Sequence, residues 1–166
     1  EVLSYIPPQT NFSFEHGVFP LLLDQGQPVY AYPSSAYWID IGTPEKYRQL
    51  HRDLLSGKSS QYAPHLPREV VIGEHCHIHP TAQLKGAVVI GAGCTILEDT
   101  VIEESIIWRN TWVGQRVRVK NSIIANNCRL EADSTVEDSI LADNVTVASG
   151  FRLEPGSKIL PGTSVA

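Results

Sequence analysis

Residues 90–107 read IGAGCTILEDTVIEESII, and this stretch decides the fold. Its aliphatic residues recur at every sixth position, at Ile90, Ile96 and Ile102, and after one dropped residue the series resumes at Ile107. A hexad repeat grouped in threes predicts a parallel β-helix with a triangular cross-section, in which three short strands make one coil of 17 or 18 residues. The inward-pointing anchors of this series are all branched and aliphatic: Ile72, Ile78, Leu84, Ile90, Ile96, Ile102, Ile107, Val113, Val119, Ile124, Leu130, Val136, Leu141, Val147, Leu153, Ile159 and Val165.

A second set of positions, four residues after each anchor, is predicted to point inward near a corner of the coil. None of these residues is charged, and most are small or β-branched. All three cysteines fall in this set, so we interpret them as buried thiols rather than metal or redox groups. The set is Cys76, Ala82, Val88, Cys94, Thr100, Ile106, Thr111, Val117, Ile123, Cys128, Ser134, Ile140, Val145, Phe151, Ser157 and Thr163.

Composition excludes several classes of partner. Thirteen basic against eighteen acidic residues give a net charge of −5, which opposes the positive field of a nucleic-acid binder. No apolar run approaches the ~20 residues that cross a bilayer, and no signal-like segment opens the chain. We therefore expect a cytoplasmic protein with neither a nucleic-acid nor a membrane partner. Because the chain begins at Glu1 and contains no Met, we expect it to be a piece of a longer polypeptide.

The first sixty residues lack the hexad period and predict a different kind of structure. Residues 17–23 predict a short helix that ends near Gly26, and residues 28–32 and 36–41 predict two strands joined by a turn. A second helix is predicted to begin at Thr43 as N-cap and to end at Gly57. Its apolar face, and the aromatic residues before it, indicate the end of a larger α/β domain.

The stretch FSFEHGVFPLLL (residues 12–23), followed by YWIDIGTPEKY (37–47) directly before hexapeptide coils, resembles the sugar-1-phosphate nucleotidyltransferases. Among these it is most similar to the mannose-1-phosphate guanylyltransferase branch. The resemblance implies a left-handed β-helix, although parallel crossovers are right-handed almost everywhere. The expected fold is mainly β: residues 1–57 are the terminal α/β piece of a Rossmann-like nucleotidyltransferase domain, 58–69 a linker, and 70–166 a left-handed parallel β-helix of five to six coils.

The same resemblance implies the function. The full-length enzyme would condense an NTP with a sugar 1-phosphate to an NDP-sugar and pyrophosphate, with GTP and mannose 1-phosphate as the closest match. The resemblance also implies that Asp40, the aspartate of the W-x-D-x-G segment, is one ligand of Mg²⁺, the expected cofactor. Alternatively, Asp40 braces the Gly42–Thr43 turn. The family's glycine-rich nucleotide loop is absent, so this chain alone is predicted to be inactive. The β-helix is expected to serve oligomerisation or regulation, within a homo-oligomer.

Two other functions stay open. A hexapeptide acyltransferase would use a histidine at a coil edge as general base, but the hexad register contains no inserted loop. A purely structural assembly module is the third possibility. His75, His77 and His79 alternate along the first coil, and we interpret them as solvated surface, with a zinc or nickel site as the alternative.

A group of cations also invites a functional interpretation. Arg116, Arg118 and Lys120 alternate outward, with further cations and two tryptophans beside them. The group predicts a small anion site or a subunit contact, or else a charged face that discourages edge aggregation. The neighbours are Arg109, Arg129, Trp108 and Trp112.

Overall fold

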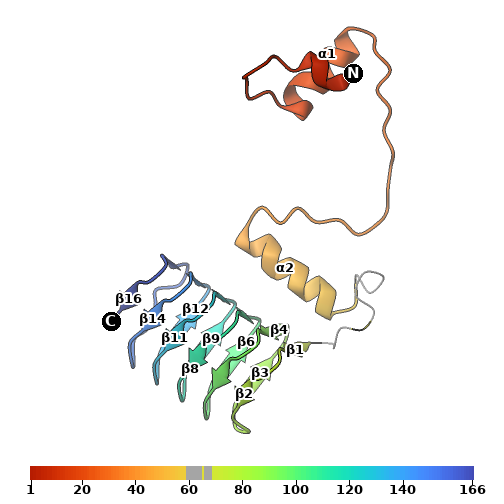
Figure 1. Cartoon of the computed structure of the whole chain (residues 1–166). Coiled ribbons are helices and arrows are strands. Elements are labelled where there is room, and N and C mark those ends of the chain that lie inside the picture. Colours follow the sequence, from red (N-terminus) through yellow and green to blue (C-terminus); the bar gives the residue numbers. More distant parts are fainter. Residues whose placement is uncertain (59–64, 66–68) are drawn as a thin grey trace. The chain divides into compact units, whose positions relative to one another are not determined.

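The computed structural model describes residues 1–58, 65 and 69–166 (Figure 1). The chain divides into two compact units, Glu1–Tyr37 and Trp38–Ala166, so that the second helix belongs to the same unit as the β-helix. Within the described residues, no helix is both long and apolar enough to span a membrane. Most of the predicted linker, 58–69, lies outside these residues.

The first unit is a small helical structure. It contains the 3₁₀-helix η1 (Val2–Tyr5), the π-helix η2 (Phe14–Val18) and the α-helix α1 (Phe19–Asp24). The Ser13 hydroxyl accepts a hydrogen bond from the backbone N–H of His16 and so caps η2. The predicted helix before Gly26 is confirmed, although helical structure begins three residues earlier than predicted.

The predicted hairpin of residues 28–32 and 36–41 is wrong. Neither segment forms a β-strand, and the Tyr30, Tyr32 and Trp38 side chains are 91%, 92% and 81% exposed. Their β-branched and aromatic residues favour strands locally, but a two-stranded ribbon is at best marginally stable unless a sheet or a helix covers it.

The β-helix consists of three parallel sheets (Figure 1). Sheet A has the order β1 (Val70–Ile72), β4 (Val88–Ile90), β7 (Ile106–Ile107), β10 (Ile123–Ile124), β13 (Ile140–Leu141) and β15 (Lys158–Ile159). Sheet B contains β2 (His77–Ile78), β5 (Thr95–Ile96), β8 (Trp112–Val113), β11 (Arg129–Leu130), β14 (Thr146–Val147) and β16 (Ser164–Val165). Sheet C contains β3 (Gln83–Lys85), β6 (Val101–Glu103), β9 (Arg118–Lys120) and β12 (Thr135–Glu137).

The predicted anchors stack in vertical columns. In sheet A, Ile90 pairs in register with Ile107, which pairs with Ile124, which pairs with Leu141. Sheets B and C repeat this alignment, as the pairs Ile96–Val113 and Ile102–Val119 show. The parallel β-helix and its register are therefore confirmed, while the left-handed sense of the coils stays a prediction.

The predicted orientation of Ile106, Ile123 and Ile140 is wrong. Each immediately precedes an anchor on a two-residue strand, and successive side chains of a strand point to opposite faces. These isoleucines therefore face outward on sheet A. The inward corner is filled instead by Ser105, Ser122 and Ser139, which are fully buried. The cause is the dropped residue, which shortens the hexad at this corner by one position.

The corners are built from residues with positive φ, stacked one above another. One column contains His75, Gly93, Asn110, Asn127, Asn144 and Gly162, and another contains Asp99, Arg116, Asp133 and Gly150. Asn and Asp are the side chains that most readily adopt this backbone conformation, and glycine adopts it freely.

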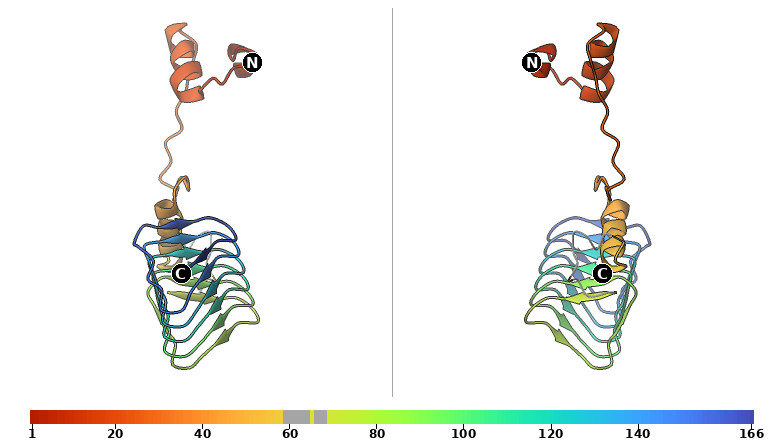
Figure 2. Two further views of the ribbon diagram at one scale, coloured as in Figure 1. Left: turned by 90° about the vertical axis from the view of Figure 1, so that its left-hand side faces the viewer. Right: turned by 90° about the vertical axis from the view of Figure 1, so that its right-hand side faces the viewer.

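Helix α2 (Pro44–Leu55) lies along sheet A. Its N-cap is Thr43, as predicted, whose hydroxyl accepts from the backbone N–H of Lys46 at 3.3 Å. Figure 2 shows that the helix runs in the direction in which the coils stack. Twelve residues at about 1.5 Å each match four coil separations of about 4.8 Å, so one face of α2 can touch most of the strands of sheet A.

Candidate functional site

Asp40, the predicted magnesium ligand, is exposed at the end of the extended segment before α2. Both oxygens of its carboxylate lie 3.7 Å from the point where a β-carbon on Gly42 would stand. The carboxylate therefore lies beside Gly42, and both predicted roles of Asp40 stay predictions.

The described residues do not by themselves fit a magnesium site. Magnesium prefers an octahedral set of oxygen ligands, usually one or two carboxylates with substrate phosphates and water. In residues 1–58, 65 and 69–166, no three His, Cys, Asp or Glu side chains come together in a way that could hold a metal ion. Asp40 therefore supplies at most one ligand.

The outward face of sheet A is apolar where α2 touches it. One cavity is lined by Val89 and Ile106 of the sheet together with Tyr47 and His51 of the helix. Another is lined by Val71 and Val89 together with His51, Leu54 and Leu55. A cavity of about 400 Å³ lies between Tyr47, His51 and the strands β4 and β7, and it extends to Trp108 and Arg109. It brings two aromatic rings, an imidazole and a guanidinium around an aliphatic floor.

A second cavity of about 400 Å³ opens at the N-terminal end of α2. It is lined by the turn before the helix and by the later coils, at Ile123 and Ile140. The pKa of Glu45, in the first turn of α2, is lowered mainly by a backbone hydrogen bond and then by a hydrogen bond with the Thr43 hydroxyl. The positive charges of Arg48 and of Lys158 in β15 lower this pKa further. Helix α2 thus begins near the last coils.

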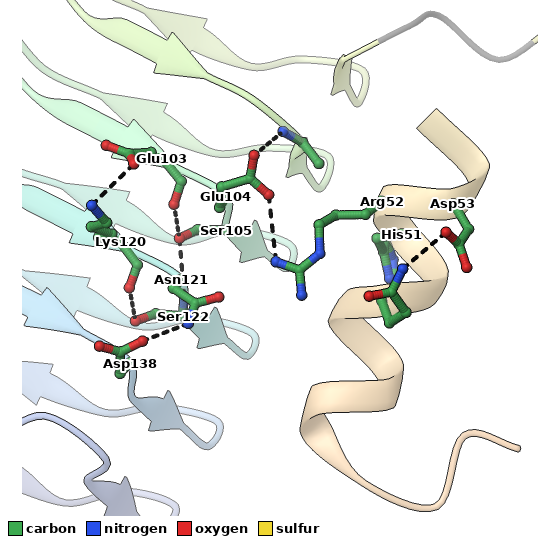
Figure 3. Close-up of polar contacts among 12 residues, drawn as sticks. His51, Arg52, Asp53, Glu103, Glu104, Ser105, Lys120, Asn121, Ser122 and Asp138 are labelled. Carbon is green, nitrogen blue, oxygen red and sulfur yellow. Dashed lines mark hydrogen bonds and ion pairs between the residues drawn. The ribbon is translucent and has the colours of Figure 1, made fainter. Parts of the chain in front are cut away.

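The C-terminal end of α2 lies near the first coils. Arg52 forms an ion pair with Glu104 at 3.6 Å, and the other oxygen of Glu104 accepts from the backbone N–H of Ala87 at 3.3 Å (Figure 3). In the same view, Lys120 pairs with Glu103 at 3.1 Å. The contact between Arg52 and Glu104 joins α2 to a corner of the β-helix.

The three histidines of the first coil are exposed, as predicted. His77 and His79 line a shallow groove of about 410 Å³ on sheet B, with Thr95 and Leu97 of the next coil. The backbone N–H of Thr81 donates to Nδ1 of His79 at 3.3 Å, so this nitrogen is already used as an acceptor. His75 lies at a corner with φ of 58° and does not line the groove.

The structure does not bring the predicted cations together on one face. Arg118 and Lys120 lie on sheet C, and Trp112 and Arg129 lie on sheet B. Arg116 makes two hydrogen bonds to Asp133 in the next coil, at 2.7 and 2.9 Å, and these bonds lower the pKa of Asp133. Arg129 bonds to Glu131 and stacks over Trp112, with 4.0 Å between its guanidinium carbon and the ring centroid.

The cysteines occupy the predicted corner positions. Cys94 and Cys128 are buried and Cys76 is half-buried. Burial raises the pKa of the Cys94 thiol to about 11 and also raises that of Cys128. Because the thiolate is the reactive form, both buried thiols are structural.

The cavity at Tyr47, His51 and Trp108 was not among the predicted sites. A signal for it exists in the sequence: an aliphatic residue precedes the sheet A anchor in five consecutive coils, at Val71, Val89, Ile106, Ile123 and Ile140. A strand apolar on both faces needs a cover on the outside, and the neighbouring amphipathic helix supplies it.

Comparison with known proteins gives a family match and several relatives. The family model of the EIF2B subunit epsilon LbH domain matches residues 68–166. A glucose-1-phosphate adenylyltransferase of Desulfitobacterium hafniense is 29% identical over 150 residues, which cover 88% of this chain and 37% of the relative. One of Clostridium perfringens is 25% identical over 164 residues, covering 93% and 40%. The chain thus spans about two fifths of the length of these curated relatives.

Among solved structures, a mutant perosamine N-acetyltransferase of Caulobacter crescentus, in complex with CoA and GDP-perosamine, is 18% identical. The match covers 84% of this chain and 67% of that chain, with a TM-score of 0.36. A similarity at this level does not bear on function.

Proposed function

Because this chain belongs, through residues 68–166, to the family of the EIF2B subunit epsilon LbH domain, we propose that it is the C-terminal part of a sugar-1-phosphate nucleotidyltransferase. The whole protein would join an NTP and a sugar 1-phosphate to an NDP-sugar and release pyrophosphate. In this proposal the β-helix serves assembly or regulation, and the residues before it complete the catalytic domain.

The extent of the match carries the proposal. The adenylyltransferase relatives align over 88–93% of the chain, which extends beyond the β-helix into the residues before it. Those residues contain the W-x-D-x-G-T-P-E segment, 38–45, in which Thr43 and Pro44 begin α2. An acyltransferase is less well supported, because residues 70–165 form successive coils without a loop that leaves the β-helix.

We propose GTP and mannose 1-phosphate as the substrates, on the resemblance of residues 12–23 and 37–47. ATP and glucose 1-phosphate, which the names of the relatives suggest, are the competing pair. We also propose that Asp40 supplies one carboxylate to a magnesium site whose other ligands lie outside the described residues. Its exposure, directly before the N-terminus of α2, supports this role.

The test uses the complete product of the gene that encodes this chain. Pyrophosphate release is measured with magnesium and each of the two substrate pairs. We expect turnover with GTP and mannose 1-phosphate and none from the isolated 166-residue chain. Release with ATP and glucose 1-phosphate alone would overturn the substrate proposal, and release with neither pair would overturn nucleotidyl transfer.

Asp40 is tested in the same assay. Asp40→Asn should lower kcat by more than the roughly 10–100-fold that loss of a residue supporting a metal ligand costs. Asp24→Asn, which changes an exposed aspartate of the first unit, should leave kcat unchanged. Full activity of Asp40→Asn would show that this carboxylate only braces the turn.

A further inference from the structure

The cavity between α2 and sheet A has the size and composition of a binding site. Its volume of about 400 Å³ lies within the roughly 300–1,000 Å³ of small-molecule pockets, which combine apolar walls with a few polar groups. The half-buried Val89 and the buried Ile106 line its aliphatic side, and His51 and Arg109 also line it.

Two aromatic side chains form the walls. The ring centroids of Tyr47 and Trp108 lie 6.5 Å apart with an interplanar angle of 68°, so the rings meet at an edge. Trp108 stays 39% exposed although it lies beside an apolar floor. A β-carbon on Gly91 would stand 2.8 Å from backbone atoms of Trp108 and Arg109, so the two neighbouring coils approach each other closely at this glycine. The exposed part of the Trp108 ring therefore gives the cavity one flat surface for a planar ligand.

The polar groups of the cavity suit a hydrogen-bond donor and an anion on the ligand. Nδ1 of His51 lies 2.9 Å from the backbone carbonyl of Tyr47; since a carbonyl only accepts, Nδ1 carries the hydrogen and Nε2 is left for a ligand. Among the described residues, the Arg109 guanidinium makes no ion pair or side-chain hydrogen bond. Asn126, which also lines the cavity, donates hydrogen bonds from its backbone and side-chain amides to the carboxylate of Asp143.

We infer that this cavity binds a small aromatic anion of about the size of a nucleoside monophosphate. The planar ring lies beside Val89 and against Trp108, and the anionic group pairs with Arg109. Arginine suits this role because its planar fork binds phosphate oxygens in pairs. The inference does not rest on nucleotidyl transfer, since no residue of the proposed catalytic segment lines this cavity except Tyr47.

The experiment titrates the 166-residue chain with inosine 5′-monophosphate, inosine and inorganic phosphate, followed by calorimetry and by tryptophan fluorescence. We expect saturable binding of the nucleotide and at least about tenfold weaker binding of the nucleoside and of phosphate, because each lacks one of the two recognised groups. Equal affinity for inosine and its monophosphate would overturn the role of Arg109. Absence of saturable nucleotide binding would overturn the site.

Matched variants separate the two halves of the site. Arg109→Gln should weaken nucleotide binding about tenfold and leave inosine binding unchanged, whereas Arg118→Gln, at an exposed arginine of sheet C, should change neither. Trp108→Leu should weaken both about tenfold. Since Trp108 also packs on Tyr47, thermal unfolding of each variant is recorded, and Arg109→Gln decides the outcome if Trp108→Leu loosens α2. An unchanged nucleotide affinity in Arg109→Gln contradicts the inference. If the chain binds no nucleotide but forms a dimer that Arg109→Gln dissociates, the cavity is occupied by a second copy of the chain, and the inference is overturned.

Discussion

At the scale of single residues, the buried hydroxyl groups of the β-helix connect one coil to the next. The backbone N–H of Ser122 donates to the hydroxyl of Ser105 at 3.0 Å (Figure 3). The backbone N–H of Ser139 donates to the hydroxyl of Ser122 at 3.1 Å. Thr100 and Thr111 make the same kind of contact at the other corners. Because a buried polar group costs free energy unless it is hydrogen-bonded, these columns require the register that the anchors set.

The ion pair between Arg116 and Asp133 predicts a pH-dependent contribution to stability. Its hydrogen bonds lower the pKa of Asp133, so the stabilisation is present above the ordinary aspartate pKa and is lost as the pH falls through the lowered value. Asp133→Asn should therefore lower the free energy of unfolding at about pH 7 and have little effect at about pH 2. Urea unfolding at both pH values measures the difference. A variant whose deficit stays the same at low pH would show that the effect is steric.

The three thiols should react at different rates. Burial raises the pKa of Cys94 to about 11 and that of Cys128 above its ordinary value, so neither forms an appreciable thiolate in a folded chain at about pH 8. Iodoacetamide should modify Cys76 alone in the native protein and all three cysteines in urea. Mass spectrometry of the peptides gives the result, and rapid native labelling of Cys94 would contradict the buried corner.

At the scale of elements, the slip in the hexad series determines what α2 can do. The anchors were predictable from the sequence because their spacing repeats through every coil. The outward isoleucines were not, because the second inward position was placed four residues after every anchor, although the shortened corner moves that residue to the outer face. The hairpin failed for a related reason: local residue types favour strands, but pairing needs a neighbouring surface.

The two faces of strand β7 should respond differently to truncation. Ile107→Ala leaves a cavity among the stacked anchors and should cost about 2–5 kcal/mol of unfolding free energy. Ile106→Ala should cost less and should mainly increase amide hydrogen exchange in α2, which covers this side chain. Chemical unfolding and hydrogen exchange of both variants measure these effects. Equal exchange in α2 for the two variants would contradict the outward orientation of Ile106.

The cap of α2 should be separable from the β-helix. Thr43→Ala removes the side-chain acceptor for the N–H of Lys46 and should destabilise the first turn by about 1 kcal/mol, seen as faster exchange of the amides at 46 and 47. Thr43→Ser should restore the protection. The β-helix amides should be unaffected by either change, and a uniform increase throughout both would show that the whole unit depends on this cap.

At the scale of the molecule, the aromatic residues between α1 and α2 are the least protected part of the described chain. The segment is extended, and Tyr30, Tyr32 and Trp38 are 91%, 92% and 81% exposed. Chymotrypsin should therefore cut here first and leave a resistant fragment that retains α2 and the β-helix. N-terminal sequencing of the fragment identifies the cut, and protection of Tyr30 would show that the predicted hairpin forms.

The match between α2 and the coils beneath it restricts how this architecture can be lengthened or shortened. A repeat inserted under the helix would displace every later strand by one coil separation. The helix could then contact the early coils or the late coils, but not both. A repeat added after the last coil would leave the contacts between α2 and the existing coils unchanged. Engineered elongation of the solenoid should therefore be tolerated at its C-terminal end and penalised in its middle.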